Sequence, residues 1–369
     1  MKKALVHDWY YINGGAEKVV QSITNIWSDL DHFSIIDFLK DDDREHILKG
    51  KKAKTSFIQN LPTVKKNHRK FLNFFPYAIE QFDLSKYNVV ISSSASVAKG
   101  VLTNQNQLHI CYCHSPVRYA WDLYYEYLND KKLTKGFKAV YAKKVLHKLR
   151  IWDIVSSNRV DLFVANSNYI ANRIKKTYNR EATVIYPPVN TIAFELEINK
   201  DDYYVAASRL VSYKKIALIV EAFSLMPDKK LKVIGDGPEF KKIKKLATKN
   251  IEILGAQKNK EFIKLLQKAK ALVYAADEDF GILPVEAQSC GTPIIAYRKG
   301  GLLETVIENE TGIFFNHQSL IDIINAVKLF ETKKFDPKLI RENAKRFSVA
   351  RFEKEFKAFV ENNIKTFFS

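Results

Sequence analysis

Two series of short apolar runs, each alternating with helical patterns, meet at Pro187 and Pro188 and limit how this chain can fold. In the first series the apolar runs cover residues 4–6, 32–38, 88–92, 108–113, 162–165 and 183–186. Strands that alternate with helices in this way predict a parallel sheet with helices on both faces. Because two adjacent prolines cannot continue a strand, we expect a domain boundary there.

The second series repeats the pattern, and the chain then ends in a long amphipathic helical segment over residues 349–368. Its apolar runs cover residues 203–206, 231–234, 251–254, 271–274, 293–296 and 312–315. We therefore predict an α/β protein with two Rossmann-like, doubly wound domains that face each other across a cleft. The first domain is expected over 1–187, with the C-terminal helix of about 352–369 crossing back to it, and the second over 188–351. Such sheets bind ligands at the carboxyl ends of their strands, so the cleft is the expected site.

The charge of the chain is strongly positive, with a formal net charge of +18 in 369 residues. Such a charge indicates a polyanionic partner, which is nucleic acid, an anionic lipid surface or a phosphorylated substrate. Residues 49–70 are rich in basic side chains, and residues 131–150 hold eight lysines and arginines and no acid. In the latter, apolar residues recur at about helical spacing between lysines, at Phe137, Val140, Tyr141, Val145 and Leu149. A helix of this kind either lies on an anionic membrane or packs its apolar stripe on its own domain, and we favour the membrane.

The location expected for this chain is cytoplasmic, peripheral on the inner face of the membrane. No apolar stretch approaches the roughly 20 residues of a membrane span. The first apolar run, 4–6, is too short for a signal peptide. The three cysteines form no disulfide framework, and no second cluster of cysteine and histidine with ligand spacing accompanies them. We therefore expect reduced thiols and no metal site.

Glycine pairs and turns follow two of the predicted strands. Gly14 and Gly15 follow the first strand and precede a helix, so that backbone can approach a ligand and the helix start favours an anion. This pair does not form the G-x-G-x-x-G dinucleotide pattern, which makes a dehydrogenase less favoured. Gly235 opens the turn Gly-Asp-Gly-Pro, which either approaches a nucleotide or simply reverses the chain.

Two cations, Arg209 and Lys214, follow the first strand of the second domain. A forked guanidinium and a compact ammonium at a strand end suit a diphosphate, although exposed surface charge is the alternative. His114 follows the strand over 108–113 in the first domain. A lone histidine is more often structural, but its place at a strand end favours a role at the cleft.

The segment from Glu278 to Glu286 carries the strongest signal, because it joins an apolar strand to a helix start near Pro284. Backbone N–H groups at such a start bind phosphate. Glu286 can accept two ribose hydroxyls, or it can simply stabilise the helix dipole. Glu278 lies in the loop and has no such structural explanation. The other residues assigned here to nucleotide binding are Phe280, Gly281, Ile282 and Leu283.

These segments, taken in order, resemble the glycosyltransferase family 4 group of retaining enzymes with the GT-B fold. The spaced glutamates of that family match Glu278 and Glu286. Further matching segments are GGAEKV, CHSPVRYAWD, VANSNYIANRI, VIYPPVNT, ASRLVSYKKI, GDGPE and ETGIFF. HSPVRYAW, YPPV and SRLVSYKK are most similar to the mannosyltransferase-like branch that builds bacterial surface polysaccharides.

The resemblance implies a hexosyltransferase that uses a nucleotide-sugar donor and a glycan or lipid-linked glycan acceptor. It places Arg209, Lys214 and Gly15 at the diphosphate and Glu286 at the ribose. It places Glu278 and His114 at the donor sugar. The resemblance also implies that the leaving phosphate takes the acceptor proton and that no metal or other cofactor is needed. GDP-mannose is favoured over a UDP-hexose, although the loop 256–260 offers no acidic side chain to read guanine, which leaves backbone carbonyls for that task.

Three other functions fit the sequence less well. A basic nucleic-acid-binding protein fits the charge, but no recognised binding module is present, so no nucleic acid is expected as a partner. A sugar-nucleotide epimerase of the same fold would need no acceptor, and the ordered motifs disfavour it. A non-catalytic relative is disfavoured because the expected site residues are intact.

Overall fold

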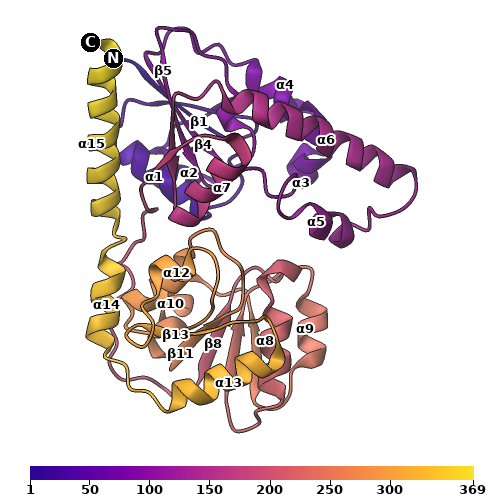
Figure 1. Ribbon diagram of the computed structural model, residues 1–369, viewed down its shortest axis with the longest axis vertical. Coiled ribbons are helices and arrows are strands. Elements are labelled where there is room, and N and C mark those ends of the chain that lie inside the picture. The colour runs from indigo at the N-terminus through magenta and orange to yellow at the C-terminus, as the bar shows by residue number, and fades with distance from the viewer. The chain divides into compact units, whose positions relative to one another are not determined.

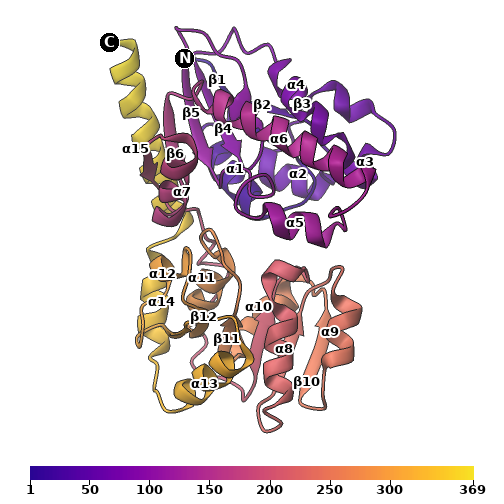
Figure 2. The same ribbon diagram turned by 45° about the vertical axis from the view of Figure 1, so that its right-hand side comes forward.

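The computed structural model describes residues 1–369, which divide into two compact units. Unit 1 comprises Met1–Pro188 and Ala350–Ser369, and unit 2 comprises Val189–Val349. Each unit is a parallel sheet with helices on both faces, as Figures 1 and 2 show. The chain leaves unit 1 directly after the two prolines, which cannot extend its last strand.

The sheet of unit 1 has seven parallel strands in the order β3-β2-β1-β4-β5-β6-β7. The strands are β1 (Lys3–His7), β2 (Asp31–Ser34), β3 (Lys54–Thr55), β4 (Val89–Ser94), β5 (Leu108–Cys113), β6 (Leu162–Ala165) and β7 (Ala182–Val184). Central strands β4 and β5 are buried along their whole length, as expected for a sheet covered on both faces. The edge strand β3 was not expected from the sequence, because two residues carry no pattern.

Helices cover both faces of this sheet (Figure 1). The α-helices are α1 (Gly15–Ile26), α2 (Asp41–Leu48), α3 (Val64–Asn67), α4 (Phe75–Glu80), α5 (Tyr124–Asp130), α6 (Phe137–Ser157), α7 (Asn168–Tyr178) and α15 (Val349–Phe368). Three short 3-10 helices are η1 (Phe57–Asn60), η2 (His68–Phe74) and η3 (Ala98–Gly100).

The C-terminal helix α15 packs on unit 1, which confirms the predicted return of the chain. Phe352 and Phe356 are fully buried in the same cluster as Leu5 and Tyr112. The ring of Tyr112 lies 5.8 Å from that of Phe352, and the ring of Trp27 lies 6.2 Å from that of Phe356. An amphipathic helix without this contact would expose its aromatic face to water.

The apolar stripe expected around residues 137–149 divides into two parts. Helix α6 begins at Phe137, whose side chain is 95% exposed, and Val140 and Tyr141 are exposed as well. Leu149 is buried in the core of unit 1. The end of the stripe therefore packs on its own unit, whereas the first turns present apolar side chains to solvent. No helix in the chain has both the length and the hydropathy to span a membrane.

The sheet of unit 2 has six parallel strands in the order β10-β9-β8-β11-β12-β13. The strands are β8 (Tyr204–Ala207), β9 (Leu231–Ile234), β10 (Ile251–Gly255), β11 (Ala271–Tyr274), β12 (Ile294–Tyr297) and β13 (Gly312–Phe315). The helices are α8 (Ile216–Ser224), α9 (Phe240–Leu246), α10 (Asn259–Lys268), α11 (Ile282–Ser289), α12 (Leu302–Thr305), α13 (Leu320–Glu331), α14 (Pro337–Lys345) and the 3-10 turn η4 (Ser212–Lys214). In both sheets the first strand of the unit lies in the middle. Every apolar run that the sequence predicts as a strand forms a strand of one of the two sheets.

We predict that Phe356→Ala destabilises unit 1 by about 3–5 kcal/mol, because it leaves a cavity in a closed aromatic cluster. All four tryptophans of the chain lie in unit 1, so the urea dependence of tryptophan fluorescence reports on this unit alone. Phe368→Ala, at the 36% exposed end of the same helix, is the control and should change stability little. Equal effects of the two changes would contradict the docking of α15.

Candidate active site

Lys214 and Glu278 form an ion pair at the carboxyl edge of the unit 2 sheet. Lys214 ends the 3-10 turn that follows β8, and Glu278 lies in the loop that follows β11. The hydroxyl of Tyr274, the last residue of β11, donates to Glu278 Oε1 at 3.1 Å. Strands β8 and β11 are neighbours, so two loops distant in sequence bring a cation and a carboxylate together.

Burial and charge together set the protonation of this cluster. Burial disfavours the ammonium of Lys214, but the adjacent carboxylate of Glu278 outweighs it and raises the pKa of Lys214 above its ordinary value. Burial, followed by the charge of Glu278, raises the pKa of Tyr274. At neutral pH the cluster therefore holds an ammonium and a neutral phenol beside Glu278.

The loop that carries Glu278 is held by a second glycine pair, Gly300 and Gly301. The N–H of Gly301 donates to the carbonyl of Glu278 at 2.8 Å. A Cβ atom on Gly300 would lie 2.2 Å from that carbonyl oxygen, and φ of Gly300 is +70°. Only glycine fits this contact without a shift of the backbone. The sequence carries this signal as the Gly-Gly after the fifth strand of the unit, but no role was assigned to it.

The start of helix α11 follows Glu278 directly. Gly281 is the N-cap and Ile282 the first helical residue, so the N–H groups of Gly281, Ile282 and Leu283 lie at the helix start. Groups at this position have no partner within a helix, and together with the helix dipole they suit a phosphate. Glu286 lies further along α11 and is 5% exposed.

Among the residues predicted to bind the nucleotide, Phe280 has a buried side chain and Arg209 has an exposed one. The ring of Phe280 is buried and packs edge-on against Phe347 at 5.3 Å, so this residue can offer a ligand only its backbone. The side chain of Arg209 is exposed at the carboxyl edge of the sheet, where it follows β8. Gly235 lies against the turn that carries Arg209, because a Cβ atom on it would come within 1.9 Å of the Ser208 carbonyl oxygen.

In unit 1, the half-buried His114 belongs to a series of polar contacts at the carboxyl edge of the sheet, whose other members are buried. His114 Nε2 lies 2.8 Å from Ser93 Oγ. His7 lies opposite Ser93 in the β1–β4 pairing, and its Nδ1 is 3.1 Å from both the carbonyl and the hydroxyl oxygen of Ser93. His7 Nε2 faces Glu17 Oε1 at 3.7 Å. The contacts therefore lead from Glu17 through His7 and Ser93 to His114.

The contacts from Glu17 to Ser93 bear on which ring nitrogen of His114 carries the proton. Burial opposes the charge of His7, but Glu17 outweighs it and raises the pKa of His7 above 6.5. Burial and the charge of His7 lower the pKa of His114 to about 3, so His114 is neutral. A protonated His7 donates from Nδ1 to Ser93, whose hydroxyl then donates to His114 Nε2. In this arrangement, in which the hydroxyl of Ser93 accepts from His7, the proton of His114 lies on Nδ1, and this histidine can act as a hydrogen-bond donor.

Gly14 and Gly15 lie at the start of α1, with Gly14 as N-cap and Gly15 as the first helical residue. The N–H of Gly14 donates to Glu17 Oε2 at 3.1 Å, so one carboxylate both caps the helix and faces His7. Gly15 is exposed at the helix start, as an anion site requires.

Asp8 organises this edge of unit 1, and no role was predicted for it. Its buried carboxylate accepts four backbone N–H groups, from Ala95 (2.6 Å), Ser96 (2.9 Å), Val97 (2.7 Å) and Ala98 (2.7 Å). A carboxylate that accepts this many bonds fixes the loop after β4 beside Ser93. The only signal in the sequence was an acidic residue at the end of an apolar strand.

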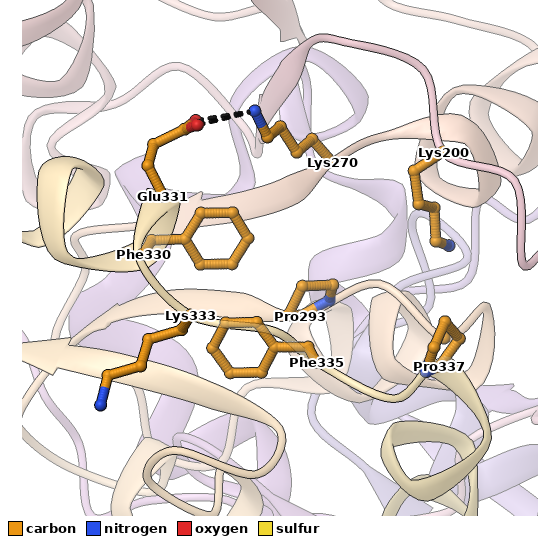
Figure 3. A pocket seen from close by; sticks show the side chains of 9 residues that line it. Lys200, Lys270, Pro293, Phe330, Glu331, Lys333, Phe335 and Pro337 are labelled. Carbon is orange, nitrogen blue, oxygen red and sulfur yellow. Dashed lines mark hydrogen bonds and ion pairs between the residues drawn. The ribbon is translucent and has the colours of Figure 1, made fainter.

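A cavity of about 300 Å³ lies at the amino edge of the unit 2 sheet (Figure 3). Lys270 in its wall is paired with Glu331 at 2.8 Å. Lys200 donates to the carbonyls of Gln267 (2.8 Å) and Cys290 (2.9 Å) and to Thr292 Oγ1 (2.9 Å), and burial lowers its pKa to about 8. All three N–H donors of the Lys200 ammonium are hydrogen-bonded within the protein. Lys200 therefore stabilises the segment before β8 and has no donor left for a ligand.

Two family models match the chain, one in each unit. "Glycosyltransferase Family 4" matches residues 13–192, and "Glycosyl transferases group 1" matches residues 189–347. The chain belongs to glycosyltransferase family 4. The residues described above lie within the two matched ranges, with His114 and Gly15 in one and Lys214 and Glu278 in the other. No three His, Cys, Asp or Glu side chains in the chain are grouped so as to hold a metal ion.

Relatives of this family 4 chain include an uncharacterized glycosyltransferase of Methanocaldococcus jannaschii, which is 32% identical over 51% of this chain and 54% of its own length. The chain thus spans about half of that relative. It is 25% identical to the alpha-1,3/1,6-mannosyltransferase ALG2 of Dictyostelium discoideum over 76% of this chain and 75% of that protein. Among solved structures, Anabaena HepE in complex with UDP-glucose has a TM-score of 0.71 at 16% identity, covering 98% of this chain and 100% of that one. This likeness shows the GT-B fold.

We predict that Lys214→Met in this family 4 chain weakens the binding of its nucleotide by about 10- to 100-fold, as expected for the loss of a charged hydrogen bond worth about 1.5–3 kcal/mol. Titration calorimetry with GDP and UDP measures the change. Lys264→Met removes the same charge from an exposed position on α10 and is the matched control. Unchanged affinity in Lys214→Met would remove this lysine from the site.

We predict that Glu17→Gln moves the alkaline limb of kcat/KM to lower pH. Protonated His7 holds the donor tautomer of His114, and this arrangement is lost as pH rises through the raised pKa of His7. Glutamine can still accept the N–H of Gly14, but it no longer favours the charged imidazole, so the pKa of His7 falls. A pH profile identical to that of the wild type would contradict the tautomer assignment.

Proposed function

We propose that this chain is a retaining hexosyltransferase that moves mannose from GDP-mannose to a lipid-linked or surface-polysaccharide glycan. The observation that carries the proposal is the pairing of Lys214 with Glu278 beside the start of α11. An ammonium and a helix start suit a diphosphate, and the carboxylate accepts sugar hydroxyls. Arg209 would supply the second cation.

The proposed reaction exchanges two bonds at the anomeric carbon of the donor. The bond from this carbon to the diphosphate oxygen breaks, and a bond to the acceptor oxygen forms on the same face. The proton of the acceptor hydroxyl passes to the departing phosphate. Lys214 and the N–H groups at the start of α11 stabilise the charge that develops on this phosphate, so the proposal includes no metal ion. His114 Nδ1–H would donate to a sugar oxygen.

The acceptors that the second unit offers support guanine as the donor base. In the loop after β10, the side-chain amide of Gln257 donates to the carbonyl of Leu254 at 2.6 Å. Its own oxygen and neighbouring carbonyls are left to accept from guanine, whose edge presents N–H donors. The mannosyltransferase name of the Dictyostelium relative supports mannose. The complex of HepE with UDP-glucose supports the alternative, a UDP-hexose.

The proposed acceptor binds to unit 1, and we propose that the protein attaches peripherally to the cytoplasmic face of an anionic membrane. Residues 131–150 carry eight basic side chains and no acid, and the first turns of α6 expose Phe137, Val140 and Tyr141. Each basic residue near an anionic surface contributes about 1 kcal/mol of attraction. Apolar side chains on such a helix add insertion into the headgroup region.

We predict that GDP raises the melting temperature of the protein more than UDP or ADP at equal concentration. A ligand at 100 times its Kd stabilises the native state by about 2.7 kcal/mol. Thermal shift with each nucleotide, followed by transfer assays with GDP-mannose and UDP-glucose, tests the assignment. A larger shift with UDP would replace the donor, and the absence of any shift with all three would contradict the proposed activity.

A further inference from the structure

A cavity of about 780 Å³ lies in unit 1 between η2, α5 and the first half of α6. Figures 1 and 2 both show α5 and the N-terminal end of α6 near α3, which leads into η2. The apolar part of its wall consists of Leu72, Tyr127, Leu133, Phe137, Tyr141, Ala142, Val145 and Leu146. This volume is within the range of ligand sites that are mostly apolar.

Cations from both walls surround this cavity. Arg69 and Lys70 line it from η2, Lys131 follows α5, and Lys138 lies in the first turn of α6. No acidic side chain is among the residues that line it. An apolar interior with lysine and arginine on opposing walls suits a molecule with an apolar chain and an anionic head.

Packed side chains connect the cavity to the carboxyl edge of the unit 1 sheet, where His114 lies. The ring of Tyr127, in its wall, lies 5.8 Å from that of Tyr119. The hydroxyl of Tyr119 lies 2.7 Å from Ser96 Oγ, and Ser96 belongs to the loop held by Asp8. The wall of the cavity is therefore in contact, through Tyr127 and Tyr119, with the loop that Asp8 holds beside Ser93.

We propose that this cavity binds the lipid of the acceptor, with the hydrocarbon chain against the apolar wall and its phosphate between Arg69 and Lys138. This inference rests on the proposed transfer to a lipid-linked glycan. It goes further, because it assigns recognition of the lipid to one cavity and to the cations that line that cavity, rather than to the positive charge of the whole chain. Bulk anionic membrane would meet Lys143 and Lys144 as readily, although these exposed residues of α6 do not line the cavity.

Dodecyl phosphate below its micelle concentration is the probe, and its Kd is measured by titration calorimetry with the full chain. Arg69→Gln with Lys138→Gln removes two cations of the cavity, and Lys143→Gln with Lys144→Gln removes two from the same helix outside it. We expect at least a tenfold weaker Kd in the first pair and less than a twofold change in the second. Equal losses in both pairs, or no loss in the first, would overturn the proposal.

Ala142→Trp fills the cavity, and Val140→Trp adds the same side chain to an exposed position on the same helix. We expect the first change to weaken dodecyl phosphate at least tenfold and the second to leave it within twofold. Binding of dodecyl maltoside or inorganic phosphate as tight as that of dodecyl phosphate would overturn the pairing of chain and phosphate. Stabilisation by GDP, measured in every variant, checks folding and tests the proposed donor separately from the cavity.

Discussion

The parallel pairing of each unit's first strand with its fourth, β1 with β4 and β8 with β11, is the constraint on which the rest of the structure depends. In each sheet, the chain first builds away to one side of this central strand and then returns to the other. The loops that leave the two paired strands therefore begin side by side at the carboxyl edge, where sheets of this kind bind ligands. His7 and Ser93 meet at this point in unit 1, and Lys214 and Glu278 meet there in unit 2.

The fold could be predicted because its signals are local. Apolar runs bounded by turns become strands, two prolines end the first unit, and an amphipathic pattern at the C-terminus needs a partner surface. The surroundings of α6 could not be predicted in the same way. Its stripe from Phe137 to Leu149 is continuous in sequence, but only the end near Leu149 meets the core of unit 1. Periodicity gives the face of a helix and not the length over which a neighbour covers it.

The candidate site could be predicted where a motif places a chemical group directly after a strand, as for Lys214, Glu278 and His114. The supporting residues could not, because their roles come from contacts across the sheet. Asp8 and the loop it holds are almost 90 positions apart, and His7 reaches Ser93 only through the register of β1 with β4. Gly300 supports Glu278 in the same way from the loop after the next strand of the sheet. Each is a common residue type whose function is set by topology.

Amide hydrogen exchange with and without GDP tests whether the nucleotide binds at the carboxyl edge of the unit 2 sheet. We expect slower exchange in residues 208–216, 277–286 and 297–303, at the carboxyl ends of β8, β11 and β12. We expect no change at the opposite edge, in residues 199–203 and 228–231. Protection at that opposite edge, or none in the loops around Lys214 and Glu278, would contradict this placement of the nucleotide.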